Sequence, residues 1–458
     1  MFDFFKKNKI TDLNQQYSDK NMAPFRAQFD ILDRRERQLR QGTAIVLIDE
    51  NGISLELDNK EKLFFPLRDI LSFRIFDGSI RFDLLSQQAI EIRHLGNLRQ
   101  DFLNRFAHEW NDVLLAEMYS GQILHKTDLD AIFSLEQGEH KNKGRFFKET
   151  LCQIRLYGNI LVIMPQGERF LVFPYDTMIG INEEGGNLII NLGLGDKLTM
   201  GRVDDDFKEN FLHIINEEII QTQRNLAKML PDLEEISIRK LAILMKGGKA
   251  AKKRDVDAAS ILIWPVLEDK LRDLGIGEQY DYLKRRAQDD KIAIGLKMGI
   301  YNDTDKEYGW FMAPIYSLTP KDPGNTIALQ TTSAKDKTET TYFFRIMEKH
   351  EYVDHFKRLE KIAQETEHLI YKINRYMLAA SFRKDLFFIS DEDLEMPQYS
   401  RFKFIIKRMP EIQELRFLYA GRITHNSKEE WQSAVSDMLE ENVAVAKEGE
   451  WEDSSERM

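Results

Sequence analysis

Two short stretches that resemble each other decide the fold, "FFPLRDILSF" at residues 64–73 and "VFPYDTMIGI" at residues 172–181. In each stretch an apolar pair is followed by a proline and then by more apolar residues. Sliding the chain along itself until Pro66 falls on Pro174 also places Gly78 on Gly186. Because this alignment needs no gap and keeps the turn positions, the sequence predicts a module that occurs twice.

Each copy of the module is predicted to contain about six short strands followed by one helix. The strand-like runs alternate apolar and polar residues, and Asp77-Gly78 is the best hairpin signal between them. The helix that follows has apolar residues at every fourth position, an apolar stripe for the sheet to receive. These residues are Phe102, Phe106 and Trp110 in the first copy and Phe207, Phe211 and Ile215 in the second.

This order of elements resembles the pleckstrin-homology-like (PH-like) superfamily over residues 40–120 and 148–230. The resemblance implies a bent antiparallel barrel closed by a C-terminal helix, and a platform for protein–protein interactions. Members of the superfamily bind phosphoinositides through Lys and Arg of the first hairpin. The sequences taken here for that hairpin, "LIDENGIS" and "IRLYGNIL", offer only Arg155, so phosphoinositide binding is not expected.

The predicted fold class is α+β, with a different kind of domain in the second half. Four strand-like runs between residues 291 and 347 predict a four-stranded antiparallel sheet, with helices before and after it. The predicted organisation is an N-terminal helical arm (1–39), repeat one (40–120), repeat two (148–232), a helix and basic linker (233–254), an α+β domain (255–382), a mainly helical region (383–447) and an acidic tail (448–458).

Composition limits the function. The formal net charge of −11 opposes general binding to nucleic acid or anionic membranes, and one cysteine excludes an intramolecular disulfide. No apolar run reaches the length of a membrane helix, and the start, "MFDFFKKNKI", lacks the features of a secretory signal. A soluble, cytoplasmic protein is therefore predicted, with the N-terminal Phe/Lys stub either docked on a neighbouring surface or touching a membrane.

A basic segment is the one candidate binding site. Its "GGK" is not a phosphate-binding P-loop, because no glycine stands five residues before Gly248 and Ala250 replaces the Ser or Thr. An anion or nucleic-acid contact stays open, against the alternative of a solvated linker. The five cations are Lys246, Lys249, Lys252, Lys253 and Arg254.

Catalytic and metal-binding patterns find little support. The nine histidines include no HExxH or HxH motif, so no metal site or cofactor is predicted. The "NDTDKEYG" segment at 302–309 has Tyr308 and Pro314 where a calcium loop needs Gly and Glu, and a hairpin is predicted instead. Cys152 is expected to be a buried, inert thiol unless a base lies near it in space.

These observations favour a non-catalytic scaffold or adaptor that binds protein partners, with homo-oligomerisation left open. Two alternatives remain at this point. The first is an enzyme of unrecognised class with its site in residues 255–450. The second is a nucleic-acid or membrane-surface protein that uses the basic segment 246–254.

Overall fold

The computed structural model describes residues 24–119, 124–136, 147–300, 303–317, 324–331, 340–354, 359–379, 389, 391–424 and 427–443. The chain is mixed α+β and divides into two compact units. The first takes in the described residues of Met1–Leu135, Arg145–Phe173 and Thr199–Val203, and the second those of Glu136–Gly144, Pro174–Leu198 and Asp204–Met458.

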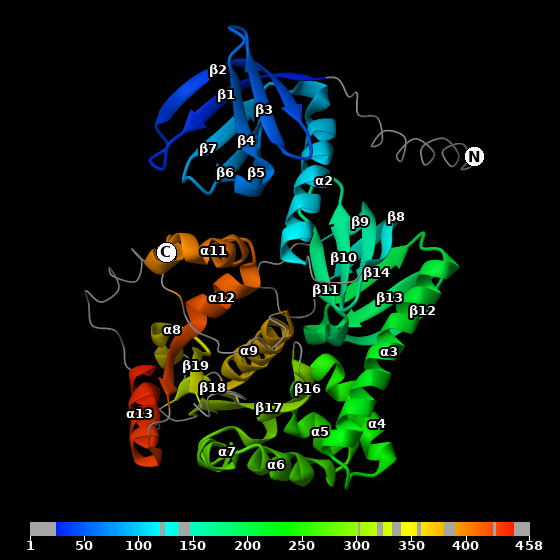
Figure 1. Ribbon diagram of the computed structural model, residues 1–458, viewed down its shortest axis with the longest axis vertical. Helices are drawn as coiled ribbons and strands as arrows, with labels where there is room; N and C mark the ends of the chain where they lie inside the picture. Colours follow the sequence, from blue (N-terminus) through cyan, green and yellow to red (C-terminus); the bar gives the residue numbers. More distant parts are fainter. Residues whose placement is uncertain are drawn as a thin grey trace. The chain divides into compact units, whose positions relative to one another are not determined.

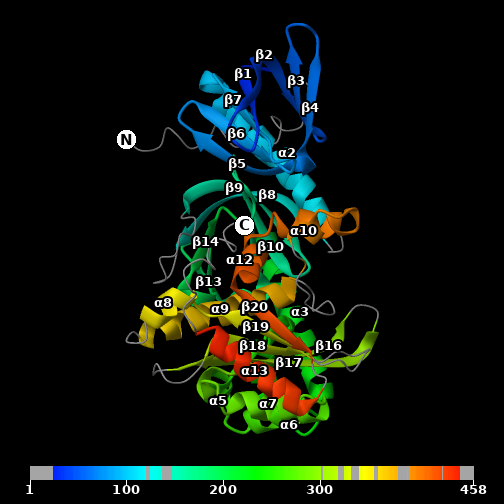
Figure 2. The same ribbon diagram turned by 90° about the vertical axis from the view of Figure 1, so that its left-hand side faces the viewer.

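The first sheet is antiparallel, curled and seven-stranded, and one long helix follows it in the chain (Figures 1 and 2). Its strand order is β4-β3-β2-β1-β7-β6-β5. Helix α2 places Phe102, Phe106 and Trp110 against the sheet, where Phe106 meets Phe73 edge-to-face at 5.3 Å between ring centroids. The elements are β1 (Phe25–Leu32), β2 (Gln38–Ile48), β3 (Gly52–Leu57), β4 (Lys62–Pro66), β5 (Ile70–Phe76), β6 (Ser79–Leu84), β7 (Ala89–Arg93) and α2 (Arg99–Met118).

The second sheet repeats the first, with the order β11-β10-β9-β8-β14-β13-β12. Its elements are β8 (Leu124–Glu136), β9 (Phe147–Tyr157), β10 (Ile160–Pro165), β11 (Leu171–Pro174), β12 (Met178–Glu184), β13 (Asn187–Leu192), β14 (Lys197–Gly201) and α3 (Asp205–Met229). The offset that places Pro174 on Pro66 also places both ends of β10, β12, β13 and β14 on the ends of β3, β5, β6 and β7. The predicted duplication is therefore confirmed at the level of element order, with seven strands in each copy where six were expected.

The repeated prolines lie at the same corner in both sheets. Pro66 ends β4 and Pro174 ends β11, and each of these strands is the edge strand of its sheet. A proline cannot donate a ladder hydrogen bond, which an edge position tolerates. A 3-10 turn follows in each copy, η1 (Leu67–Asp69) and η3 (Tyr175–Thr177), before the chain enters β5 or β12.

The helix expected before the first repeat is wrong, because residues 25–32 form strand β1 and pair with β2. Phe25, Ala27, Phe29 and Ile31 are buried at every second position, which is the period of a strand. The first hairpin of sheet 1 is consequently β1–β2, with the turn Asp33–Arg37, and not "LIDENGIS". The two stretches that were compared with the phosphoinositide-binding hairpin form the β2–β3 and β9–β10 hairpins, and the absence of phosphoinositide binding stays a prediction.

The remainder of the second unit surrounds a third antiparallel sheet of six strands, ordered β15-β16-β17-β18-β19-β20, where four were expected. Helices cover both faces (Figure 1). One face packs Phe311 and Phe343 against Trp264, Tyr280 and Trp431. The strands are β15 (Ala251–Lys252), β16 (Ala293–Ile300), β17 (Asp303–Tyr316), β18 (Asn325–Thr331), β19 (Thr340–Arg345) and β20 (Tyr419–Thr424).

On the other face, Met312 and Leu329 pack against Ile370 and Ile373 of α9. The α-helices of this region are α4 (Glu235–Leu244), α5 (Lys253–Ala259), α6 (Ile263–Asp273), α7 (Gly277–Lys284), α8 (Lys349–Asp354), α9 (Leu359–Ala379), α10 (Asp391–Leu394), α11 (Ser400–Ile406), α12 (Pro410–Leu418) and α13 (Lys428–Glu441).

One prediction about this region needs correction. Residues 419–424 were expected to be helical but form β20, which pairs with β19. Gly421 there has φ +157°, an extended conformation that glycine adopts readily. Asp204 caps the start of α3 by accepting a hydrogen bond from Phe207 N, and Ser427 caps α13 by accepting one from Glu430 N.

Candidate functional site

Helix α2 of the first module also packs on the outer face of the second sheet. Asn111 donates from Nδ2 to Glu168 O (3.0 Å), and Phe170 N donates to Asn111 Oδ1 (3.2 Å). Arg155 of β9, which is 9% exposed, forms an ion pair with Asp112 (2.8 Å). Strand β10 is consequently buried on both of its faces, whereas its counterpart β3 is not. This contact is one helix seated on one sheet face, and we call it the module contact.

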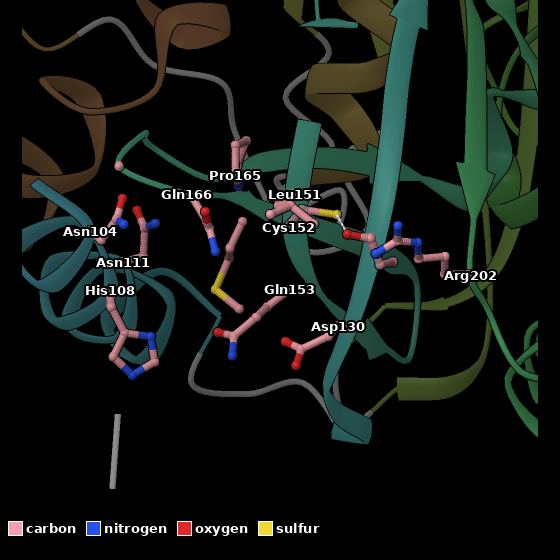
Figure 3. A pocket seen from close by; sticks show the side chains of 13 residues that line it. Asn104, His108, Asn111, Asp130, Leu151, Cys152, Gln153, Pro165, Gln166 and Arg202 are labelled. Carbon is pink, nitrogen blue, oxygen red and sulfur yellow. Dashed lines mark hydrogen bonds between the residues drawn. The ribbon is translucent and has the colours of Figure 1, made fainter. Parts of the chain in front are cut away.

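A small pocket of about 280 Å³ lies within the module contact (Figure 3). Asn104, His108 and Asn111 of α2 line one side, while Gln153 and Gln166 approach from the sheet (Figure 3). Ligand pockets of drug size usually measure about 300–1,000 Å³. The remaining lining residues are Asp130, Ala131, Leu151, Cys152, Met164, Pro165, Gly167 and Arg202.

Cys152 and His108 both line this pocket, but the thiol and the imidazole stand apart in it (Figure 3). The thiol is buried, and it donates to Ala131 O at 3.6 Å. Burial raises the pKa of Cys152 to about 12, which keeps the thiol protonated at neutral pH. The expectation of a buried thiol is confirmed, and a thiol with a raised pKa is not an activated nucleophile.

The first sheet has the same outer face with different residues on it. At the offset that aligns the two prolines, Leu47 matches Arg155, Ile45 matches Gln153, and Phe64 matches Val172. Leu47 and Phe64 both lie opposite Ser54 in the ladders of β2, β3 and β4, so the two side chains share a face. The exposed fractions are 40% for Ile45, 37% for Leu47 and 52% for Phe64. These three residues form an exposed apolar surface, which we call the sheet-1 face.

Helix α3 repeats α2 when "FLNRFAHEWND" at 102–112 is aligned with "FKENFLHIINE" at 207–217. The buried Phe102 and Phe106 match the buried Phe207 and Phe211. The residues of α2 that meet sheet 2 also have counterparts, because His108 matches His213, Asn111 matches Asn216, and Asp112 matches Glu217. All three counterparts are exposed on α3, and we call them the α3 stripe.

The basic segment is built into the second unit. Lys246 is 4% exposed and donates to Met178 O (3.1 Å), while Lys249 donates to Asp176 O (3.1 Å). Both carbonyls belong to the segment that follows the repeated proline. Between these two lysines, just after the end of α4, Gly247 and Gly248 adopt positive φ angles (+68° and +93°), which glycine tolerates best.

The other three cations of the segment form ion pairs. Lys252 and Arg254 both contact Glu367 of α9, at 2.6 and 3.2 Å. Lys253 contacts Asp289 at 2.9 Å and Asp257 at 3.1 Å. All five predicted contact residues thus have partners within the chain, and binding of an anion or nucleic acid to them stays a prediction.

No pattern in the sequence predicted the buried ionic cluster around Lys246. Burial raises the pKa of Glu218 to about 7 and lowers that of Lys246 to about 8. Burial also raises the pKa of Asp176 and lowers the pKa values of Lys249 and Lys297. Neither the pocket over sheet 2 nor a second pocket near Gly78 and His94 includes a residue of this cluster.

Among the described residues, no group of three or more His, Cys, Asp or Glu side chains could hold a metal ion. Residues 303–309 are part of β17, which pairs with β16 from Asp303 onward, so a β16–β17 hairpin is present and this segment belongs to its second strand. His350 contacts Glu348 (3.2 Å), and His355 lies outside the described residues. The N-terminal stub, Met1–Ile10, and the acidic tail also lie outside them.

No protein-family model matches this chain, and no curated protein sequence matches it. In the part of the chain that the structure describes, no helix has both the length and the apolar character to cross a membrane.

Proposed function

We propose that the protein is a non-catalytic scaffold or adaptor that binds protein partners through two PH-like modules. The support is the duplication of a curled seven-stranded sheet with a C-terminal helix, the element order of that superfamily. The observation that carries the proposal is the sheet-1 face. On the second sheet the counterpart of Leu47 is Arg155, which is buried and contacts Asp112 of α2, whereas Ile45, Leu47 and Phe64 expose apolar area of the kind found at interaction sites.

The two alternatives have less support. The basic segment 246–254 directs its cations to Glu367, Asp289 and backbone carbonyls, which reduces the charge it offers to a polyanion. Shifted pKa values are common at catalytic sites, but burial accounts for those of Glu218 and Lys246.

A photo-cross-linking amino acid at position 64 of the full chain tests the proposal in the source cells. The expected result is a covalent adduct with one or a few proteins. A matched chain with the probe at Ile243, which is 60% exposed on α4, should give only background. Background labelling from position 64 as well would overturn the proposal.

A further inference from the structure

The chain contains one complete module contact. It also contains a second copy of each of the two surfaces that form this contact, and both second copies are exposed. Helix α2 and the face of sheet 2 form it within the first unit, through Asn111 and the Asp112–Arg155 pair. The sheet-1 face is the same surface of the first module, with its apolar residues exposed. The α3 stripe is the same surface of the second module's helix, and it is also exposed.

We propose that the sheet-1 face of one chain binds the α3 stripe of a second copy, repeating the module contact between molecules. This inference rests on the proposed function and names the partner. The partner is a second copy because each chain exposes both a sheet-1 face and an α3 stripe. The same two kinds of surface already meet within the chain, where α2 lies on sheet 2.

The chemistry of the two halves is complementary. The α3 stripe keeps the histidine and the asparagine of α2 and carries Glu217 in place of Asp112. Ile220, one turn further along α3, is 37% exposed and adds apolar area. On the sheet-1 face the apolar Leu47 replaces Arg155, so apolar contact takes over from the ion pair.

Charges around the two halves also match. The turn that receives Asn111 in sheet 2 contains Glu168 O and Phe170 N, and the equivalent residues in sheet 1 are Lys60 and Lys62. Two lysines therefore border the face that would meet the carboxylates of Glu209 and Glu217 on α3, and one of them, Lys62, also contacts Glu56 of its own sheet at 3.7 Å. Opposite charges at the rim favour association and fix its orientation.

The symmetry of such a contact determines which kind of oligomer forms. The two surfaces differ, so the contact is heterologous, and each chain that joins leaves one new half unmatched. A heterologous contact builds open chains or closed rings and does not stop at an isologous dimer. One helix on one sheet face is a small interface, so the dissociation constant should be on the order of 10 µM or weaker.

The test is sedimentation velocity of the full chain at rising concentration. The wild-type chain is expected to show species larger than a dimer. Leu47→Glu places a carboxylate against Glu217 and should raise the dissociation constant at least about tenfold. Adding Glu217→Lys to Leu47→Glu should restore assembly, because the two charges then attract. Ile243→Glu is the matched control and should sediment like wild type.

Each outcome decides between the two proposals. A wild-type chain that stays monomeric, together with adducts from position 64 to another protein, overturns self-assembly and leaves the scaffold function standing. Assembly that Leu47→Glu does not weaken, or that the double variant does not recover, overturns the assigned contact. Adducts from position 64 to residues of the same molecule, such as Met1–Ile10, would also overturn it. Circular dichroism of the variants should match wild type, since Leu47 and Glu217 lie at the surface.

Discussion

The ion pair between Asp112 and Arg155 gives the sharpest prediction about how the module contact is held. Arg155 is 9% exposed, while the Asp112 side chain is 39% exposed. Removing the carboxylate therefore leaves a nearly buried guanidinium without that partner, whereas removing the guanidinium leaves a carboxylate that water can still reach. The two single substitutions should consequently differ in cost.

Asp112→Leu should destabilise the module contact by about 1–2 kcal/mol, below the roughly 3–5 kcal/mol typical of a fully buried pair because Asp112 is partly solvated. Arg155→Leu should cost less, about 0–1 kcal/mol. The double variant should return to within about 1 kcal/mol of wild type, since a buried ion pair can often be replaced by apolar residues. The leucine introduced by Arg155→Leu would then match Leu47, the residue at the same place on the sheet-1 face.

Hydrogen exchange measured by mass spectrometry follows this contact without global unfolding. The amide of Phe170 donates to Asn111 and becomes free to exchange when α2 leaves the sheet. Asp112→Leu should speed exchange in the peptide around residue 170 by about 5–30-fold. The reasoning would be refuted if the two single variants sped exchange equally. It would also be refuted if the exchange rate of the double variant rose by the product of the two single-variant factors.

Three further predictions concern the Cys152 thiol, the buried Glu218 and the cap of α3. Cys152 should react with a disulfide reagent at pH 8 only after denaturant unfolds the chain, because burial raises its pKa to about 12; rapid reaction of the native protein would contradict this. Burial raises the pKa of Glu218 to about 7 from 4.5, so the folded state holds a proton that the unfolded state has lost, and stability should fall as pH rises from about 5 to 7. In Glu218→Gln the urea midpoint should fall less over that range, and an unchanged pH dependence would remove Glu218 as its cause. Asp204→Ala removes the cap of α3 and should lower the free energy of unfolding in urea by about 1 kcal/mol. Asp205→Ala, at an exposed neighbouring position, is the control, and equal losses of stability in the two variants would argue against the cap.

The duplication could be predicted because turns and edge prolines leave local signals. Pro66 and Pro174 each end an edge strand, and Gly78 and Gly186 each adopt positive φ in the β5–β6 and β12–β13 turns. These positions depend on backbone geometry within a short stretch of chain, so one constant offset aligned them. Strand β1 was missed because Phe25, Phe29, Leu32 and Leu39 also fall roughly on one face of a helix, although the alternation from Phe25 to Ile31 was present.

The candidate surfaces could not be derived in the same way. Whether Leu47 or Glu217 is covered depends on what packs against it from elsewhere in the chain, which a single sequence does not reveal. One signal was available, since the match of His108 with His213 and of Asn111 with Asn216 is readable once the helices are aligned. The burial of Lys246 had no such signal, because Met178 O and Glu218 come to it from distant segments.

A disulfide trap between two chains tests the repeated module contact most directly. A chain with Leu47→Cys is mixed with a differently tagged chain with Glu217→Cys, and the mixture is oxidised with diamide. We expect a mixed disulfide between the two tagged chains, in higher yield than from a control mixture of Leu47→Cys with Ile243→Cys. Equal yields from the two mixtures would contradict the repeated contact.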